Sequence, residues 1–394
     1  MMKIQIVFMR KTGLLITDMS REELAEQKGK YEGWTILSPE KDIHPCIGCF
    51  SCWKKTPGRC VIKDGYDQMA ALINEAEEIV YNSRYTYGGF SRFVKNVFDR
   101  SIGYVLPYFE VSEHEMHHKR RYQDIKEITF IFRGNALSEE DKACAEQYVH
   151  AVCRNMRNRV KEVLFEEDAS PVKAECREAV PASEKLILLN CSIRGKNANS
   201  ETFLTNMADH LQKEYRFLRL SEYQNREEEL VDQLMQAETL VLAMPLYVDG
   251  LPSTVIHLLD RLKQAGFGTG RKVYVLANLG LYESHQMKNL LSMMRAWCGV
   301  SGCAYSGSVV IGAGELIGVL IRHMKSGPVR GVTKALEALA ENVTAGAKMD
   351  DLYVQPLMFP RWLYIQIANR SWDRQALASN MKPADLKICP QYEE

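Results

Sequence analysis

The sequence predicts an α/β protein with two tandem doubly wound parallel sheets, each of five strands, and a C-terminal helical extension. Three observations support this. The chain has 394 residues, 46% hydrophobic and 25% charged, which is enough for two globular domains of ordinary composition. Apolar strands alternate with amphipathic helices, as βαβ units require. One strand–turn–helix segment also occurs twice.

The repeated segment is the clearest sign of tandem organisation. EEIVYNSRYTYGGFSRFVKNVFDR at 77–100 and ETLVLAMPLYVDGLPSTVIHLLDR at 238–261 each give a hydrophobic strand, a turn and an amphipathic helix ending in Asp-Arg. An apolar strand follows each copy, at 127–134 and 271–280. We therefore predict a first domain, a Pro- and charge-rich linker, a second domain and an extension, at 1–167, 168–184, 185–325 and 326–394.

The remaining elements complete both sheets. In the second copy we expect strands at 185–193, 215–223 and 303–314, and helices at 199–212 and 226–238. In the first copy we expect strands at 3–10, 34–40 and 160–167, and helices at 21–31 and 66–77.

The extension is predicted to hold two helices, at 332–343 and 360–377. The second is rich in aromatic residues but lacks the Lys/Arg-rich polar face of a membrane-surface helix, so we expect it to pack on the body of the protein.

Charge and targeting signals exclude several classes of protein. Lys+Arg and Asp+Glu are 50 each, so no strong field favours nucleic acid or acidic lipid. The N-terminal apolar run is too short for a signal peptide, and no stretch approaches the length of a membrane span. The 11 cysteines, without a secretory signal, are typical of a reducing compartment, so we expect a cytoplasmic protein.

An anion-binding loop is predicted where the strand at 185–193 leads into the next helix. Hydroxyls, an amide and a guanidinium gather at that helix N-terminus, on Ser192, Arg194, Asn199, Ser200 and Thr202. Free backbone N–H groups and the helix dipole favour an anion there. The loop has neither a P-loop ending nor GxGxxG, so one phosphate monoester fits it best. The alternative is a polar turn in which Ser200 or Asn199 caps the helix.

Two further loops should lie beside this one, because ligands of doubly wound sheets bind past the carboxyl ends of the strands. They offer aromatic faces and backbone amides suited to a flat ring with polar edges. The predicted ring-binding residues are Pro245, Leu246, Tyr247, Val248, Asp249, Gly250, Asn278, Gly280 and Tyr282. A phosphate site beside two such loops is typical of FMN binding.

With these motifs, the second copy resembles the flavodoxin-like NAD(P)H-dependent FMN reductases. CSIRGKNANSE is similar to their phosphate loop, and Pro245, Tyr247 and Pro252 match their ring-loop pattern. The resemblance implies two tandem flavodoxin-like domains with FMN as cofactor and NAD(P)H as co-substrate. It also suggests a dimer fused into one chain, either monomeric with pseudo-dimeric domains or assembling into a homodimer.

The first copy resembles the same family and the iron–sulfur flavoproteins through CIGCFSCWKKTPGRCVIKDGYDQM, with Gly65 in place of a second Asp. Its first loop has no hydroxyl-rich anion site, so we expect a degenerate domain and flavin bound mainly by the second. The resemblance implies that Cys46, Cys49, Cys52 and Cys60 could ligate a 4Fe-4S cluster. A metal-free structural or redox segment and a zinc site remain alternatives.

These observations predict an FMN-dependent NAD(P)H oxidoreductase that reduces a flavin, quinone, nitro or azo acceptor. The flavin carries the electrons, so no catalytic acid–base pair is assigned. Two alternatives stay open: an iron–sulfur electron carrier serving a redox protein, and a non-catalytic flavodoxin-like module. No nucleic-acid or membrane partner is expected. The basic segment at 114–122 is predicted to be a solvated turn or, alternatively, a loop near the cofactor.

Overall fold

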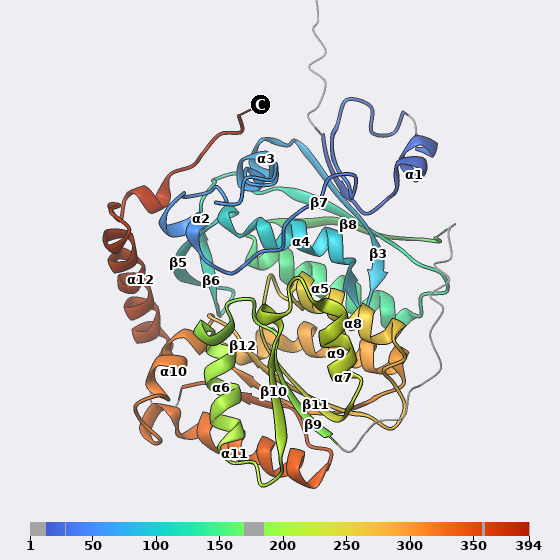
Figure 1. Ribbon diagram of the computed structural model, residues 1–394. Helices are drawn as coiled ribbons and strands as arrows, with labels where there is room; N and C mark the ends of the chain where they lie inside the picture. The colour runs from blue at the N-terminus through green and yellow to red at the C-terminus, as the bar shows by residue number, and fades with distance from the viewer. Residues whose placement is uncertain (1–12, 28, 169–184, 357–358, 394) are drawn as a thin grey trace, which may run out of the picture.

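The computed structural model describes residues 13–27, 29–168, 185–356 and 359–393 (Figure 1). The first half forms a sheet in the strand order β2-β1-β3-β7-β8, in which every neighbouring pair is parallel and the short β4 adds antiparallel to β3. Its strands are β1 (Gly13–Thr17), β2 (Thr35–Leu37), β3 (Glu78–Thr86), β4 (Gly89–Phe90), β7 (Glu127–Arg133) and β8 (Arg159–Glu166).

The strand between β2 and β3 was not predicted. The strand expected at 3–10 lies outside the described residues, and β1, with the sequence GLLIT, occupies the place between β2 and β3. All five of its residues are buried, which explains its apolar character. The linker prediction also lies outside the described residues, apart from Asp168.

The second half forms an all-parallel sheet in the order β10-β9-β11-β12-β13-β14. Its sixth strand was not expected, because it comes from the predicted extension. The strands are β9 (Lys185–Asn190), β10 (Tyr215–Arg219), β11 (Ala237–Pro245), β12 (Lys272–Asn278), β13 (Ala304–Ile311) and β14 (Leu352–Val354).

Helices between the two sheets join the halves into one hydrophobic core (Figure 1). Two helices of the first half meet their counterparts from the second: α4 packs on α8 and α5 on α9. The helices of this layer are α3 (Met69–Glu75), α4 (Arg92–Arg100), α5 (Glu139–Asn155), α7 (Glu227–Leu234), α8 (Ser253–Gln264) and α9 (Lys288–Ser301).

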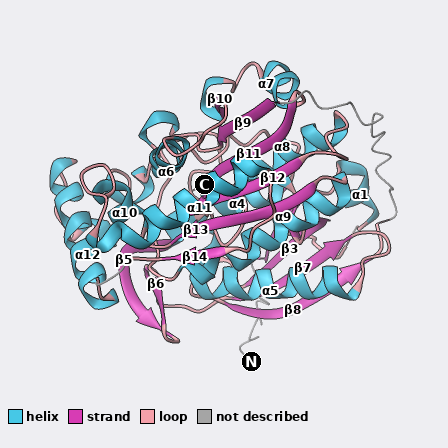
Figure 2. Ribbon diagram, turned by 90° about the horizontal axis from the view of Figure 1, so that it is seen from below, coloured by secondary structure: helices cyan, strands magenta, loops and turns pink. Residues whose placement is uncertain are grey.

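The outer faces of the sheets carry the other helices (Figure 2). On the second sheet they cover a separate apolar cluster, and they include the predicted helix of the extension, which is therefore part of this domain's core. They are α6 (Asn199–Ala208), α10 (Gly314–Leu320) and α11 (Arg330–Ala345). The first sheet has α1 (Arg21–Glu26), whose Leu24 packs on a small cluster.

A hairpin and a long helix close one side of the molecule. The hairpin pairs β5 (Val105–Ser112) with β6 (Glu115–Arg120), and α12 (Arg361–Ala378) lies against it. Asn369 of α12 binds the backbone of Phe109, accepting from its N–H at 2.8 Å and donating to its carbonyl at 3.1 Å. The helix thus packs on the body, as expected. In the described residues, no helix is long and apolar enough to cross a membrane.

Candidate functional site

A cavity of about 520 Å³ lies past the carboxyl ends of β9, β11 and β12, where the two halves meet. This volume is within the range of small-molecule and cofactor sites. Of the predicted residues, the cavity is lined by Ser192, Arg194, Asn199, Ser200, Pro245, Leu246, Tyr247, Val248, Asp249, Asn278 and Gly280. The short helix α2 (Ser51–Lys54) and α12 also contribute to its wall.

Three predicted residues lie outside this lining. The Thr202 hydroxyl accepts hydrogen bonds from the guanidinium of Arg322, at 2.7 Å from Nη2 and 3.2 Å from Nε. Gly250 closes the loop after β11 by exchanging backbone hydrogen bonds with Tyr247, at 3.0 and 3.2 Å. The Tyr282 hydroxyl donates to the carbonyl of Phe359 at 2.8 Å. All three are therefore neighbours of the cavity rather than wall residues.

The N-terminus of α6 opens into the cavity. Its N-cap residue is Ala198, and no side chain of the described residues caps it. The first backbone hydrogen bond of the helix runs from Thr202 N to Ala198 O at 3.3 Å. The N–H groups of residues 199–201 therefore have no acceptor within the helix. The Ser200 hydroxyl beside them accepts from Asn278 Nδ2 at 2.8 Å. These groups form a site suited to an anion.

Residues that were not predicted hold this loop in shape. Asn190 donates to Gly195 O at 3.1 Å and to Glu201 at 2.8 Å, and it accepts from Ser192 N at 2.9 Å. Arg219 binds the Glu201 carboxylate at 2.7 Å and neutralises it. The only acid in the first turn of α6 is therefore paired.

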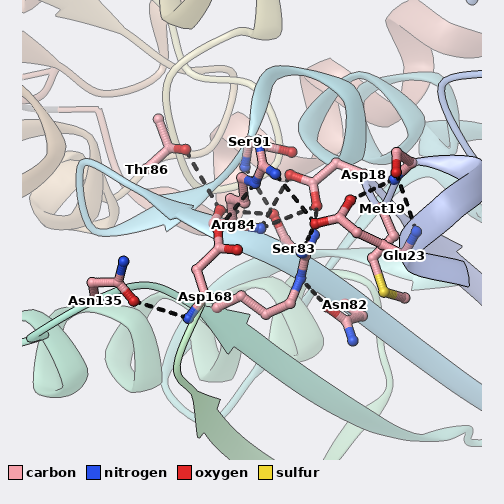
Figure 3. A network of polar contacts seen from close by, with 12 residues as sticks. Asp18, Met19, Glu23, Asn82, Ser83, Arg84, Thr86, Ser91, Asn135 and Asp168 are labelled. Atoms are coloured by element: carbon pink, nitrogen blue, oxygen red, sulfur yellow. Dashed lines mark hydrogen bonds and ion pairs between the residues drawn. The ribbon is translucent and has the colours of Figure 1, made fainter. Parts of the chain in front are cut away.

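The matching edge of the first sheet is filled by the protein's own charges (Figure 3). The N-terminus of α1 is closed by a capping box, in which Ser20 and Glu23 bind each other's backbone N–H groups. Asp18 accepts from the backbone of Arg84 at 3.0 Å and pairs with Arg133. Glu23 also binds Arg133 at 3.2 Å and Arg84 at 3.3 Å. Carboxylates thus occupy the N-terminal end of α1, whereas the corresponding end of α6 in the second half has backbone N–H groups without a capping side chain.

Side chains from the first half fix the loop after β11. The ammonium of Lys95 on α4 donates to Tyr247 O at 2.8 Å and pairs with Asp99, which accepts from Ser253 N at 2.9 Å. The backbone is left-handed at Val248 and Asp249, with φ of 39° and 61°, a conformation that is disfavoured for the β-branched Val248. External contacts therefore keep the loop in this shape.

All four cysteines of the predicted cluster motif line the same cavity. Gly48 between them has φ of 62°, and a Cβ there would come within 2.2 Å of the Tyr247 hydroxyl, so glycine lets the motif meet the second half. Burial raises the pKa of Cys46 to about 12 and that of Cys52 well above its usual value. Within the described ranges, no three His, Cys, Asp or Glu residues are grouped to hold a single metal ion.

Aromatic side chains of the first half form part of the cavity wall. Trp53 lies 4.8 Å from the ring of His118, and His118 lies 4.5 Å from Phe109. The segment expected to be a solvated turn is thus strand β6, and burial lowers the pKa of His118 to about 4, so this ring is neutral at pH 7. The guanidinium of Arg194 lies over the ring of Phe50, 5.8 Å from the ring centre. Sequence patterns gave no signal for this wall beyond the aromatic residues of the cysteine motif.

The strand orders of both sheets define a doubly wound α/β protein with its cavity at the carboxyl edge. Residues 184–317 match the family model described as the flavodoxin-like fold, and the chain has this fold. Over 75 residues it is 39% identical to an iron–sulfur flavoprotein of Methanocaldococcus jannaschii, a match that covers 18% of this chain and 38% of that relative.

The solved structures that this chain is similar to are distant in sequence. An apo NADH:FMN oxidoreductase is 14% identical, covering 42% of this chain and 91% of its own, with a TM-score of 0.35. An FMN-dependent NADH-azoreductase from Bacillus anthracis in complex with FMN is also 14% identical, covering 42% of this chain and all of its own (100%), with a TM-score of 0.31.

Proposed function

We propose that this protein is an FMN-dependent NAD(P)H oxidoreductase that binds one FMN per chain in the cavity between its halves. The observation that carries the proposal is the uncapped N-terminus of α6 at one end of a cavity of about 520 Å³. The flavodoxin-like fold of residues 184–317 supports it. When bound, FMN supplies the hydride chemistry, accepting from a reduced nicotinamide and passing electrons to an acceptor.

The residues present fit this cofactor. The N–H groups of α6 and the hydroxyls of Ser192 and Ser200 would hold the phosphate, with the charge of Arg322 nearby at Thr202. The loops at 245–249 and 278–280 would hold the ring. The first half supplies the opposite wall, so we propose that the site needs no second chain. The aromatic lining favours a flat acceptor, such as a quinone, a free flavin, or a nitro- or azo-aromatic compound.

The stoichiometry of FMN tests this proposal. Because α6 has a free N-terminus and α1 is capped and flanked by carboxylates, we expect one FMN per chain. Protein saturated with FMN and freed of excess by gel filtration should give this ratio by absorbance, and NADH or NADPH should bleach the flavin without oxygen. Two FMN per chain would contradict a degenerate first half. Colourless protein that takes up no FMN would favour the non-catalytic module.

A second candidate is an iron–sulfur electron carrier in which a cluster feeds the flavin. It is favoured by the four cysteines on the cavity wall and by the likeness to the iron–sulfur flavoprotein. The raised pKa values of Cys46 and Cys52 mean that these thiols would need a bound metal to become thiolates. In a 4Fe-4S cluster each cysteine binds a different iron, so the four sulfur atoms lie farther apart than the ligands of a single metal ion.

Iron and sulfide counts decide between the two candidates. For a carrier, anaerobic reconstitution should give about four iron and four sulfide per chain, with Cys49→Ser losing most of both. Cys144→Ser, on α5 outside the cavity lining, is the control and should keep the counts of the parent protein. Equal counts in all three proteins, or none in the parent, would leave the cysteine segment as a metal-free wall.

A further inference from the structure

Asp249 has a buried carboxyl group in which only one of the two oxygens has a hydrogen-bond partner in the described part of the chain. Its side chain is only 2% exposed and the residue lines the cavity. Oδ1 accepts a hydrogen bond from Asn155 Nδ2 at 2.6 Å. Oδ2 is equally buried, yet it has no hydrogen-bond partner within the described part of the chain. A carboxylate in this position is costly unless it is protonated or meets a ligand.

The neighbouring amide fixes which oxygen can carry a proton. His117 Nδ1 lies 2.5 Å from Asn155 Oδ1, so the ring donates there and the amide nitrogen faces Asp249. Because Oδ1 is already an acceptor, the proton of the neutral carboxyl sits on Oδ2. Asn155 and His117 are positioning residues in this arrangement. His117 is fully buried, and burial lowers its pKa, which keeps the imidazole neutral.

The electrostatic surroundings hold Asp249 near the point of ionisation. Burial raises its pKa to about 7, although the hydrogen bond from Asn155 and two nearby cations favour the charged form. Its titration is therefore poised for proton exchange near neutral pH. The titratable and charged groups that face it are Lys95 on α4, Tyr148, Cys153 and Arg154 on α5, and Glu115 on β6.

We propose that Asp249 is the acid that protonates the electron acceptor in the cavity. This inference rests on the proposed function. A quinone or azo acceptor that has taken a hydride, originally from the reduced nicotinamide, carries a negative charge on oxygen or nitrogen. Because Oδ2 is buried, the loop that holds Asp249 has to shift for the acceptor to reach it. The Oδ2–H bond of Asp249 then breaks, its electron pair stays on the carboxylate, and the proton forms the new O–H or N–H bond. Asp249 regains a proton from water after the product leaves.

The test compares acceptors that do and do not need a proton. FMN-loaded protein, reduced beforehand, is mixed in single turnovers with an azo dye or with ferricyanide, which takes one electron and no proton. Asp249→Asn should lower the ratio of the azo rate to the ferricyanide rate by about a hundredfold. In the parent protein this ratio should fall with rising pH above about 7, because the acid form is lost. Asp249→Glu should restore part of it.

A matched control and a second measurement separate this inference from the proposed function. Asp260→Asn alters a carboxyl group that binds the Tyr87 hydroxyl at 2.5 Å, is outside the cavity lining and also has a pKa raised by burial. It should leave the ratio unchanged.

In FMN-free protein, the infrared carbonyl band of a protonated carboxyl should titrate near pH 7 and be missing from Asp249→Asn. If FMN binds and is reduced but the Asn variant keeps the parent ratio, Asp249 is not the acid. If no FMN binds, the proposed function fails while the infrared result still reports on Asp249.

Discussion

Ala198→Asp should weaken FMN binding strongly while leaving the fold at least as stable as before. A carboxylate at the N-cap of α6 would bind the free N–H groups that we assign to the phosphate, stabilising the helix by about 1 kcal/mol. It would also repel the phosphate from the cavity. We expect the FMN dissociation constant to rise by about two orders of magnitude, measured by quenching of flavin fluorescence, with the unfolding midpoint of the FMN-free protein unchanged or raised.

Two variants control for this result. Ala198→Ser offers a neutral cap of similar strength, so its loss of FMN affinity should be much smaller. Ser20→Ala removes the cap of α1 in the first half and should not alter FMN affinity, since that edge is closed by its own carboxylates. Unchanged FMN binding by Ala198→Asp would place the phosphate elsewhere and remove the main support for the proposed function.

Lys95→Met should be the most destabilising single change in the region between the halves. Lys95 is fully buried and its partner Asp99 is 2% exposed, so the variant leaves a buried carboxylate without its cation and Tyr247 O without its donor. Removing one member of such a pair costs about 3–5 kcal/mol. Urea unfolding followed by tryptophan fluorescence and circular dichroism would measure this.

A double variant and a surface variant test whether the loss of stability in Lys95→Met comes from the burial of the charged pair. Lys95→Met combined with Asp99→Asn removes both charges and should lose less stability than Lys95→Met alone. Lys142→Met breaks a pair of similar helical spacing with Glu139, whose side chain is 90% exposed, and should cost less than about 1 kcal/mol. If Lys95→Met unfolds at the same urea concentration as Lys142→Met, the pair between the halves does not hold them together.

The sequence predicts both sheets because the repeat at 77–100 and 238–261 combines a strand, a turn and a helix whose apolar positions must face one core. The shorter strands escape prediction for physical reasons. β14 has three residues, only partly buried, and is defined by pairing with β13 rather than by its own pattern. β1 has only five residues, and the longer apolar run at 3–10 gives a stronger strand pattern.

The loops that line the cavity could be predicted because each follows directly from the end of a strand. Their roles in binding an anion and a ring remain predictions. By contrast, Lys95 and Asp99 look like an ordinary exposed pair at helical spacing, and only the packing of α4 on α8 buries them. Arg322 is 120 residues from Thr202, and the wall provided by α12 depends on contacts with β5. No periodic pattern encodes such distant contacts.

Contacts between α12, the segment after it and the first half also decide how accessible the cysteine segment is to solvent. Tyr108 binds Asp373 at 2.6 Å, Arg121 binds Leu386 O at 2.9 Å, and Arg59 pairs with Glu393 at 2.7 Å, next to the cysteine segment. These contacts hold residues 361–393 against the first half, where α12 forms part of the wall of the cavity that the cysteines line. Reagents that modify thiols should therefore reach the cysteine segment faster whenever residues 361–393 are detached from the first half.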